Sequence, residues 1–209
     1  ARDQKFLQGW QMGHGDILRK NDYASLVKKE LAALVRKPIL GAIAARLTGT
    51  PIRLWHDQLL YKPVDNPQRK ANVGWHTDRG YWMTTSSDEM LTAWVPFHAC
   101  DEQMGTITMI DGSHKLVGNE FELNFFDPDL EALEKKIKSH GHEIKRVPMN
   151  LARGCVSFHH CRTIHGSGPN RSDKPRRSMA IHLQDDANRY QAYKMPDGTL
   201  AQHHNNVYA

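Results

Sequence analysis

The chain has 209 residues, 39% of them hydrophobic and 24% charged, a balance typical of one soluble globular domain with its own core. No apolar run approaches the ~20 residues that a membrane span needs, and the first residues lack the pattern of a secretory signal. We therefore expect no membrane partner and a cytoplasmic location, which the three scattered cysteines also favour. The net charge of +5 comes from basic residues interleaved with acidic ones, which predicts a solvated surface and no nucleic-acid partner. The chain opens on Ala1 and not on Met, so whether residues are missing at the N-terminus stays open, as does the oligomeric state.

Helical spacing of apolar residues marks the first part of the chain. Residues 22–36 repeat apolar positions three and four apart, with Asp22 as N-cap. Pro38 opens a second helix that closes near Gly49, so helices are expected over about 22–48. β-branched and aromatic residues then predict a strand over 52–62, followed by a loop over 64–73.

Short strands dominate the remainder of the chain. One further helix is expected from Asp127-Pro128 to about Ser139, where Gly141 stops it. Many short strands after a helical lead predict a mainly β fold with flanking helices, in which two sheets enclose the core of one domain covering 1–209. The strand patterns occur at 91–97, 106–110, 143–147, 154–159 and 177–184, with a turn at 101–105.

Two imidazoles and one carboxylate are candidate ligands for a single metal. The segment Trp75-His76-Thr77-Asp78 supplies one imidazole and the carboxylate, and His165, far downstream, supplies the second imidazole. Side chains alternate along an extended segment, so His76 and Asp78 are expected to point to the same side. This donor set is the 2-His-1-carboxylate facial triad, which leaves open positions on non-haem Fe(II).

The two segments that carry these ligands resemble the phytanoyl-CoA dioxygenase family of Fe(II)- and 2-oxoglutarate-dependent oxygenases. That family pairs a Trp-His-x-Asp segment with a later His-Gly-Ser-Gly-Pro-Asn-Arg-Ser segment, and residues 165–172 have that sequence here. The resemblance covers residues 52–190 and implies that they form a double-stranded β-helix, the jelly-roll core of the cupin type. It also implies Fe(II), 2-oxoglutarate and O2 at a catalytic metal site whose ligands are His76, Asp78 and His165.

Strand alternation separates two neighbouring arginines downstream of the second segment. If residues 176–183 are extended, Arg176 lies on a small, polar face with Ser178, whereas Arg177 lies on an apolar face that belongs against other elements. The polar face suits a cavity in which a guanidinium holds a carboxylate by two parallel hydrogen bonds. The resemblance implies the same choice, because the family's 2-oxoglutarate-binding Arg follows the distal His by eleven residues, as Arg176 follows His165.

Three further positions are cofactor-binding candidates through the same resemblance. Ser167, two residues after the distal His, is similar to the family's Ser that helps to hold the carboxylate. Trp94 and Lys62 occupy places where the family has a Trp and a Lys or polar residue near the cosubstrate. Each also has a structural interpretation, as a loop hydroxyl bonded to its own backbone, a core Trp and a solvated Lys at a strand end.

Several residues near the motifs stay open between functional and structural roles. The family motif selects His165 over His159 and His160, which are expected to line the pocket, to support the ligands or to pack in the core. Candidates for the substrate wall directly follow the metal motif and are Tyr81, Trp82 and residues 84–89.

These patterns predict an Fe(II)- and 2-oxoglutarate-dependent dioxygenase that hydroxylates a small organic substrate and releases succinate and CO2. The same iron core also supports desaturation, cyclisation or epimerisation, and the sequence does not separate these outcomes. The alternative from another class is a cupin-like protein that binds metal without turnover. A structural metal, however, has no use for a carboxylate clamp beside it and favours a fourth protein ligand.

Overall fold

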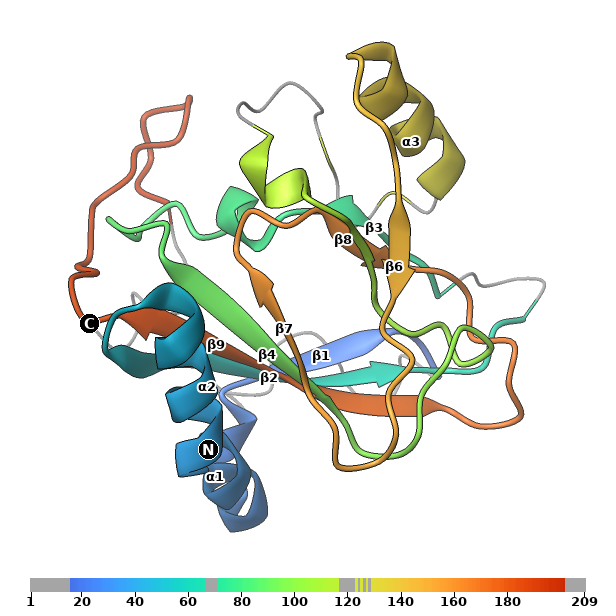
Figure 1. The fold of residues 1–209 in the computed structure, drawn as a ribbon, viewed down its shortest axis with the longest axis horizontal. Helices are drawn as coiled ribbons and strands as arrows, with labels where there is room; N and C mark the ends of the chain where they lie inside the picture. The colour runs from blue at the N-terminus through green and yellow to red at the C-terminus, as the bar shows by residue number, and fades with distance from the viewer. Residues whose placement is uncertain are drawn as a thin grey trace.

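The strands of the protein form two antiparallel sheets that lie as separate layers (Figure 1). The computed structural model describes residues 16–66, 71–116, 123, 125, 127 and 129–201. The large sheet has five strands in the order β1-β2-β9-β4-β7, and the small sheet has four in the order β3-β8-β5-β6. This arrangement confirms the predicted mainly β fold with a double-stranded β-helix core.

Most elements follow the predicted order of helices and strands, with shifts of a few residues at several ends, but the strand at 19–22 was not predicted and the first helix begins seven residues later than expected. The large sheet consists of β1 (Arg19–Asp22), β2 (Ile52–Lys62), β4 (Met90–Pro96), β7 (Ser157–His160) and β9 (Arg176–Asp185). The small sheet consists of β3 (Val73–His76), β5 (Thr108–Ile110), β6 (Arg146–Pro148) and β8 (His165–Ser167). The α-helices are α1 (Lys29–Val35), α2 (Pro38–Thr48) and α3 (Leu130–Ser139), and the 3-10 turns are η3 (Ala24–Leu26), η4 (Asp78–Gly80) and η5 (Ser113–Lys115).

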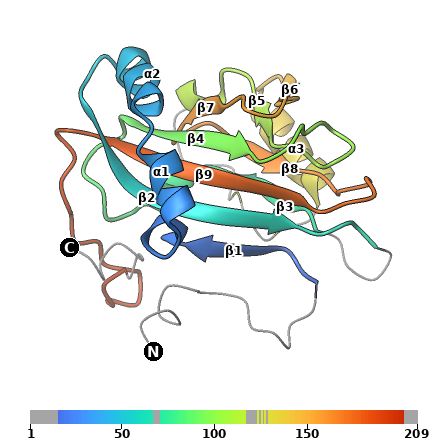
Figure 2. The same ribbon diagram turned by 90° about the horizontal axis from the view of Figure 1, so that it is seen from below.

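Helices α1 and α2 cover the outer face of the large sheet (Figure 2). Helix α2 confirms its prediction, because Pro38 begins it and Gly49 ends it in the left-handed conformation, with φ 74°. The apolar residues of β9 that alternation assigned to one face, Met179, Ile181 and Leu183, pack against these helices. None of the helices in the described part of the chain combines the length and apolar character that crossing a bilayer requires.

The predicted helix over 22–36 begins too early. Residues 19–22 form the edge strand β1, and Asp22 is not a helix cap but a buried carboxylate, 3.1 Å from Nε2 of His56 and 2.7 Å from Nε2 of Gln58. Tyr23 then adopts the left-handed conformation, with φ 54°, and α1 starts only at Lys29. Helical periodicity is a local signal, whereas the strand pairing of β1 with β2 is a long-range interaction that the local pattern does not report.

Helix α3 covers the outer face of the small sheet through Leu133 and Ile137, which pack with Trp75. The helix was predicted from Asp127-Pro128, but it begins at Leu130, where the Asp129 side chain accepts a hydrogen bond from the Ala132 N–H at 3.0 Å. Pro128 and residues 67–70 of the predicted 64–73 loop lie outside the described residues. With both outer faces covered, the inner faces of the two sheets are left to form the functional site.

Candidate metal centre

Three candidate ligands meet where β3 and β8 lie side by side. His76 is the last residue of β3 and pairs across the small sheet with His165, the first residue of β8. Asp78 opens the turn η4, and Thr77 between the two ligands keeps an extended conformation. One ligand atom from each of the three side chains lies within 4.8 Å of the other two, and the imidazole centroids are 4.1 Å apart. The structure therefore brings together the three side chains that the sequence motifs singled out.

Hydrogen bonds to the backbone determine which nitrogen of each imidazole is available. Nδ1 of His76 lies 2.8 Å from the carbonyl oxygen of Gly74, and Nδ1 of His165 lies 2.9 Å from that of Thr163. A carbonyl only accepts, so Nδ1 carries the proton in both rings and Nε2 keeps its lone pair. This tautomer leaves Nε2 of each ring available to bind a metal, and a backbone carbonyl is a common partner for the other nitrogen of a metal-binding imidazole.

Electrostatics favour the protonation states that bind a divalent metal. Burial lowers the pKa of His76, and burial, together with the repulsion that a protonated His76 or His159 would exert, lowers the pKa of His165 well below its ordinary value. Burial opposes ionisation of Asp78, but the proximity of His165 and His159 outweighs it and holds the pKa of Asp78 well below its usual range. Near neutral pH the site therefore presents two neutral imidazoles and one carboxylate, as metal binding requires.

The close approach of β3 and β8 depends on a residue without a side chain. A Cβ atom at Gly166 would lie 2.8 Å from the carbonyl oxygen of Val73 and 3.2 Å from that of Gly74. Any larger residue would push the two strands apart and move His165 away from His76. The glycine after the distal histidine thus has a physical function in assembling the site.

A cluster of buried cations lies on the inner face of the large sheet. Lys62 of β2 and Arg176 of β9 face each other in register and are 0% and 4% exposed. Lys62 donates to the carbonyl oxygens of Ser167, at 3.3 Å, and Gly168, and Nη1 of Arg176 donates to that of Gly105. No carboxylate of the residues that the structure describes lies within ion-pair distance of either cation. Burial and the charge of Arg176 accordingly lower the pKa of Lys62 well below its usual range, and burial lowers that of Arg176 to about 10.

Unsatisfied polar atoms beside these cations favour an anionic ligand. Nε of Arg176 and the hydroxyl oxygens of Ser167 and Ser178 are buried without a hydrogen-bond partner in the described part of the chain. The ring of Trp94, 1% exposed, lies 5.5 Å from the guanidinium carbon of Arg176. Buried donors and charges without partners are costly, so a bound carboxylate would relieve this cost. We call Lys62, Arg176, Ser167 and Ser178 the cationic cluster.

The two histidines that compete with His165 in the sequence have different surroundings. His159 is buried, its Nε2 lies 3.3 Å from Oδ2 of Asp78, and its ring centroid is 4.4 Å from that of His165. His160 is only half-buried, and its ring lies 5.9 Å from that of His114 instead. Of the pair, His159 adjoins the candidate ligands.

Thr92 is a residue of the site that no motif indicated. Its hydroxyl oxygen lies 2.6 Å from Oδ2 of Asp78 and 2.8 Å from Nδ1 of His182 on β9. Strand alternation was the available signal, since it places Thr92 on the face of Trp94 and His182 on the face of Arg176. Alternation alone does not show that both faces meet the metal ligands.

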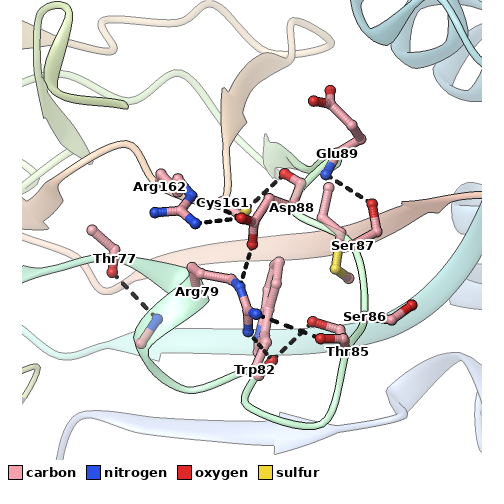
Figure 3. Close-up of polar contacts among 12 residues, drawn as sticks. Thr77, Arg79, Trp82, Thr85, Ser86, Ser87, Asp88, Glu89, Cys161 and Arg162 are labelled. Carbon is pink, nitrogen blue, oxygen red and sulfur yellow. Dashed lines mark hydrogen bonds and ion pairs between the residues drawn. The ribbon is translucent and has the colours of Figure 1, made fainter. Parts of the chain in front are cut away.

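The loop between η4 and β4, which was expected to form part of the substrate wall, is held by an ion-pair cluster (Figure 3). Asp88 accepts hydrogen bonds from Arg79 and Arg162, and Arg79 also donates to the carbonyl oxygen of Trp82 at 2.6 Å. Trp82 is 4% exposed, and its ring lies 4.8 Å from that of His182 in a T-shaped arrangement. The loop therefore presents Trp82 to the interior of the fold.

Tyr81, the other aromatic residue expected in the substrate wall, lies at the surface. It is 43% exposed, and its ring centroid is 6.1 Å from that of His76. Its phenol oxygen accepts a hydrogen bond from the N–H of Phe125 at 3.0 Å. Tyr81 thus borders the candidate metal ligands from the solvent side.

A double-stranded β-helix with two imidazoles and one carboxylate around a common point has the donor set of the non-haem Fe(II) oxygenases. The chain belongs to the phytanoyl-CoA dioxygenase family, because the family model described as "Phytanoyl-CoA dioxygenase (PhyH)" matches residues 10–178. This match confirms the resemblance found in the sequence.

Curated relatives agree with this membership. The chain is 24% identical over 155 residues to the peroxisomal phytanoyl-CoA dioxygenase of Homo sapiens, covering 74% of this chain and 46% of the relative. It is 28% identical over 177 residues to a probable alpha-ketoglutarate-dependent hypophosphite dioxygenase of Stutzerimonas stutzeri, covering 79% of this chain and 56% of the relative. The chain thus spans about half the length of these curated relatives.

Solved structures show the same fold. The carbocyclase SnoK from nogalamycin biosynthesis superposes with a TM-score of 0.71 at 26% identity, covering 90% of this chain and 72% of that chain. The epimerase SnoN, solved with Fe3+, alpha ketoglutarate and nogalamycin RO, gives a TM-score of 0.67 at 26% identity, covering 91% of this chain and 73% of that chain. EctD from S. alaskensis in its apoform gives 0.70 at 22% identity, covering 90% of this chain and 64% of that chain, and supports the fold alone.

Proposed function

We propose that this chain is an Fe(II)- and 2-oxoglutarate-dependent dioxygenase that hydroxylates a small organic substrate and releases succinate and CO2. The observation that carries the proposal is the cationic cluster, in which two buried cations and two buried hydroxyls lack an anionic partner among the described residues. The dicarboxylate cosubstrate would supply that partner. Ser167 lies two residues after His165 on β8, so both side chains point to the same side, toward one interior.

We propose that His76, Asp78 and His165 hold the metal. Their tautomers and charges suit Fe(II). A divalent metal bound to one carboxylate and two neutral imidazoles keeps a net positive charge, which favours a further anionic ligand. Bound iron would supply the redox chemistry that uses O2 to oxidise a C–H bond of the substrate. The role of these three residues is to place that chemistry at one point inside the fold.

The cationic cluster would bind and orient the cosubstrate. Arg176 would donate from Nε to its distal carboxylate, and the hydroxyls of Ser167 and Ser178 would donate to the remaining oxygens. Lys62 adds a second charge, and the ring of Trp94 closes this end of the site. Because all these side chains are buried, the charge interactions act with little screening by water.

We propose that the whole chain forms a single dioxygenase domain, in which α1 and α2 brace the large sheet from outside. Of the alternative oxidative outcomes of the same iron core, cyclisation and epimerisation gain support from the similarity to the carbocyclase SnoK and the epimerase SnoN, whereas desaturation has no such support from these two structures. A metal-binding protein without turnover is disfavoured, because an unused buried cation pair destabilises a fold.

Anaerobic titration tests the proposal. Fe(II) with 2-oxoglutarate should give a visible charge-transfer band, which His76→Ala and Arg176→Ala should lose. His160→Ala, a half-buried histidine that does not adjoin Asp78, is the matched control and should keep the band. In air, the wild-type protein should convert 2-oxoglutarate to succinate, and screening small molecules for faster succinate release would identify the substrate. Absence of both the band and succinate in the wild-type protein would refute the proposed function.

A further inference from the structure

The two oxygens of the Asp78 carboxylate have different surroundings. Oδ1 lies 3.7 Å from Nε2 of His165, on the side of the other candidate ligands. Oδ2 lies 2.6 Å from the hydroxyl of Thr92 and 3.3 Å from Nε2 of His159. One oxygen is therefore engaged by neighbouring side chains, and the other is left for a metal.

The single hydroxyl hydrogen of Thr92 has two possible acceptors, and His182 decides between them. Nδ1 of His182 lies 2.8 Å from the Thr92 hydroxyl, and burial lowers the pKa of His182 to about 3, so the ring carries one proton. If that proton is on Nδ1, His182 donates to Thr92, and the hydroxyl hydrogen of Thr92 goes to Oδ2 of Asp78. The opposite tautomer would let Nε2 of His182 donate to Oε1 of Gln58, but only over 3.4 Å. It would also turn the hydroxyl hydrogen of Thr92 toward His182 and leave two oxygens with lone pairs facing each other at 2.6 Å, which costs more.

His182 is held so that it can perform this role. It pairs in register with Thr92 of β4 and with His56 of β2, so its backbone position is set by the centre of the large sheet. Its ring lies 4.8 Å from that of Trp82 and 5.2 Å from that of His56, and the residue is 3% exposed. Buried rings on both sides limit rotation of the imidazole away from Thr92.

We propose that Thr92 and His182 are positioning residues that hold Asp78 as a metal ligand through Oδ1 alone. The inference rests on the proposed function, since it concerns the metal that His76, Asp78 and His165 would bind. A carboxylate that bound through both oxygens would occupy a position that the cosubstrate or O2 needs, because the triad is useful only while it leaves positions open. His182 has no contact with the metal in this scheme and acts through Thr92.

Four single variants test the pair, with the dissociation constant of Fe(II) measured anaerobically and the melting temperature of the metal-free protein as a second readout. Thr92→Val removes the hydroxyl at nearly constant shape and should weaken Fe(II) binding about 10- to 100-fold. Thr92→Ser keeps the hydroxyl, so its dissociation constant for Fe(II) should stay within about threefold of the wild-type value, a smaller change than that expected for Thr92→Val. His182→Phe removes the donor and should weaken binding, whereas His182→Asn offers an amide N–H in the place of Nδ1–H and should restore part of the affinity.

The double variant separates a relay from two independent effects. If His182 acts through Thr92, the combination of Thr92→Val and His182→Phe binds Fe(II) no more weakly than Thr92→Val alone. Full additivity of the two losses overturns the inference. So does a Thr92→Val protein that binds Fe(II) as tightly as wild type, whether or not its melting temperature has fallen. If Thr92→Val does not fold, the His182→Phe and His182→Asn pair decides, and equal Fe(II) affinities of the two overturn the inference. A wild-type protein that binds no Fe(II) refutes the proposed function itself, whereas failure of the variants alone leaves that function standing.

Discussion

Replacement of Arg176 by Met tests the cationic cluster through binding of the cosubstrate. In the protein without ligand Nη1 of Arg176 donates to the carbonyl oxygen of Gly105, and Nε is a fully buried donor without a partner in the described residues. One hydrogen bond between a charged donor and a carboxylate contributes about 1.5–3 kcal/mol. Since about 1.4 kcal/mol corresponds to a tenfold change in affinity, Arg176→Met should weaken 2-oxoglutarate binding about 10- to 150-fold.

A thermal shift measured anaerobically with Fe(II) makes this loss visible. At a hundredfold excess over its dissociation constant, 2-oxoglutarate stabilises the wild-type protein by about 2.7 kcal/mol. For a chain of 209 residues this raises the melting temperature by about 5–11 °C. At the same concentration the shift of Arg176→Met should fall to about half of that or less, while its stability without ligand should not fall by more than about 1 kcal/mol, because a buried unpaired cation is removed.

The neighbouring arginine offers a matched control. Arg177 is exposed on the opposite face of β9, so Arg177→Met should keep the full shift. The reasoning fails if Arg176→Met responds to 2-oxoglutarate as the wild type does, or if Arg177→Met loses the response to the same extent.

Three further predictions concern the scaffold of the site. Gly166→Ala should destabilise the protein by about 1–3 kcal/mol in urea unfolding and weaken Fe(II) binding, because the new Cβ would meet the backbone of Val73. Gly168→Ala is the control, since its Cβ would have no neighbour within 4 Å, and it should change neither stability nor Fe(II) binding. Equal effects of the two variants would contradict the role assigned to Gly166. Burial lowers the pKa of His182 from 6.5 to about 3, so between these pH values the unfolded state binds more protons than the folded state. The contribution of His182 to the free energy of unfolding should therefore be fully present above pH 6.5 and should fall as the pH drops toward 3, by up to about 1.4 kcal/mol per pH unit. In His182→Phe the free energy of unfolding should fall less steeply with pH, and an unchanged pH dependence would show that His182 does not cause it. Asp88→Ala should lower the free energy of unfolding by no more than about 1 kcal/mol, because the side chains of its ion pairs with Arg79 and Arg162 are 27–41% exposed to solvent. A loss above about 2 kcal/mol would contradict the view that these exposed ion pairs contribute little to stability.

Local patterns were sufficient where a signal repeats within a few residues. The strand over 52–62 and the helix from Pro38 were predicted with their observed starts, because alternation, proline and glycine act on the neighbouring backbone. The same alternation put Arg176 and Arg177 on opposite faces of β9, and Arg176 is buried as expected; Arg177, which was expected to lie against other elements, is exposed. The pattern failed at residues 22–28, where pairing of Asp22 with β2 overrides helical spacing, and held for α1.

Side chains that act on other side chains could not be found this way. Thr92 and His182 lie 90 positions apart, and neither belongs to a motif, yet their hydrogen bonds end on the Asp78 carboxylate. Ser178 was assigned to the polar face, but its unsatisfied hydroxyl beside Arg176 is visible only in the packed fold. These contacts depend on the register of β4, β9 and β2, which is set by long-range pairing.

By itself the sequence determined most of the helices and strands after residue 37, the three candidate ligands and the arginine eleven residues after the last of them. Only the tertiary structure decided which donors are left without partners, which oxygen of Asp78 is free and which nitrogen of each histidine carries the proton. The reason is physical. The residue type determines which hydrogen bonds and metal bonds a side chain can make. Burial and the packing of distant strands determine which of these the protein itself satisfies and which remain for a ligand.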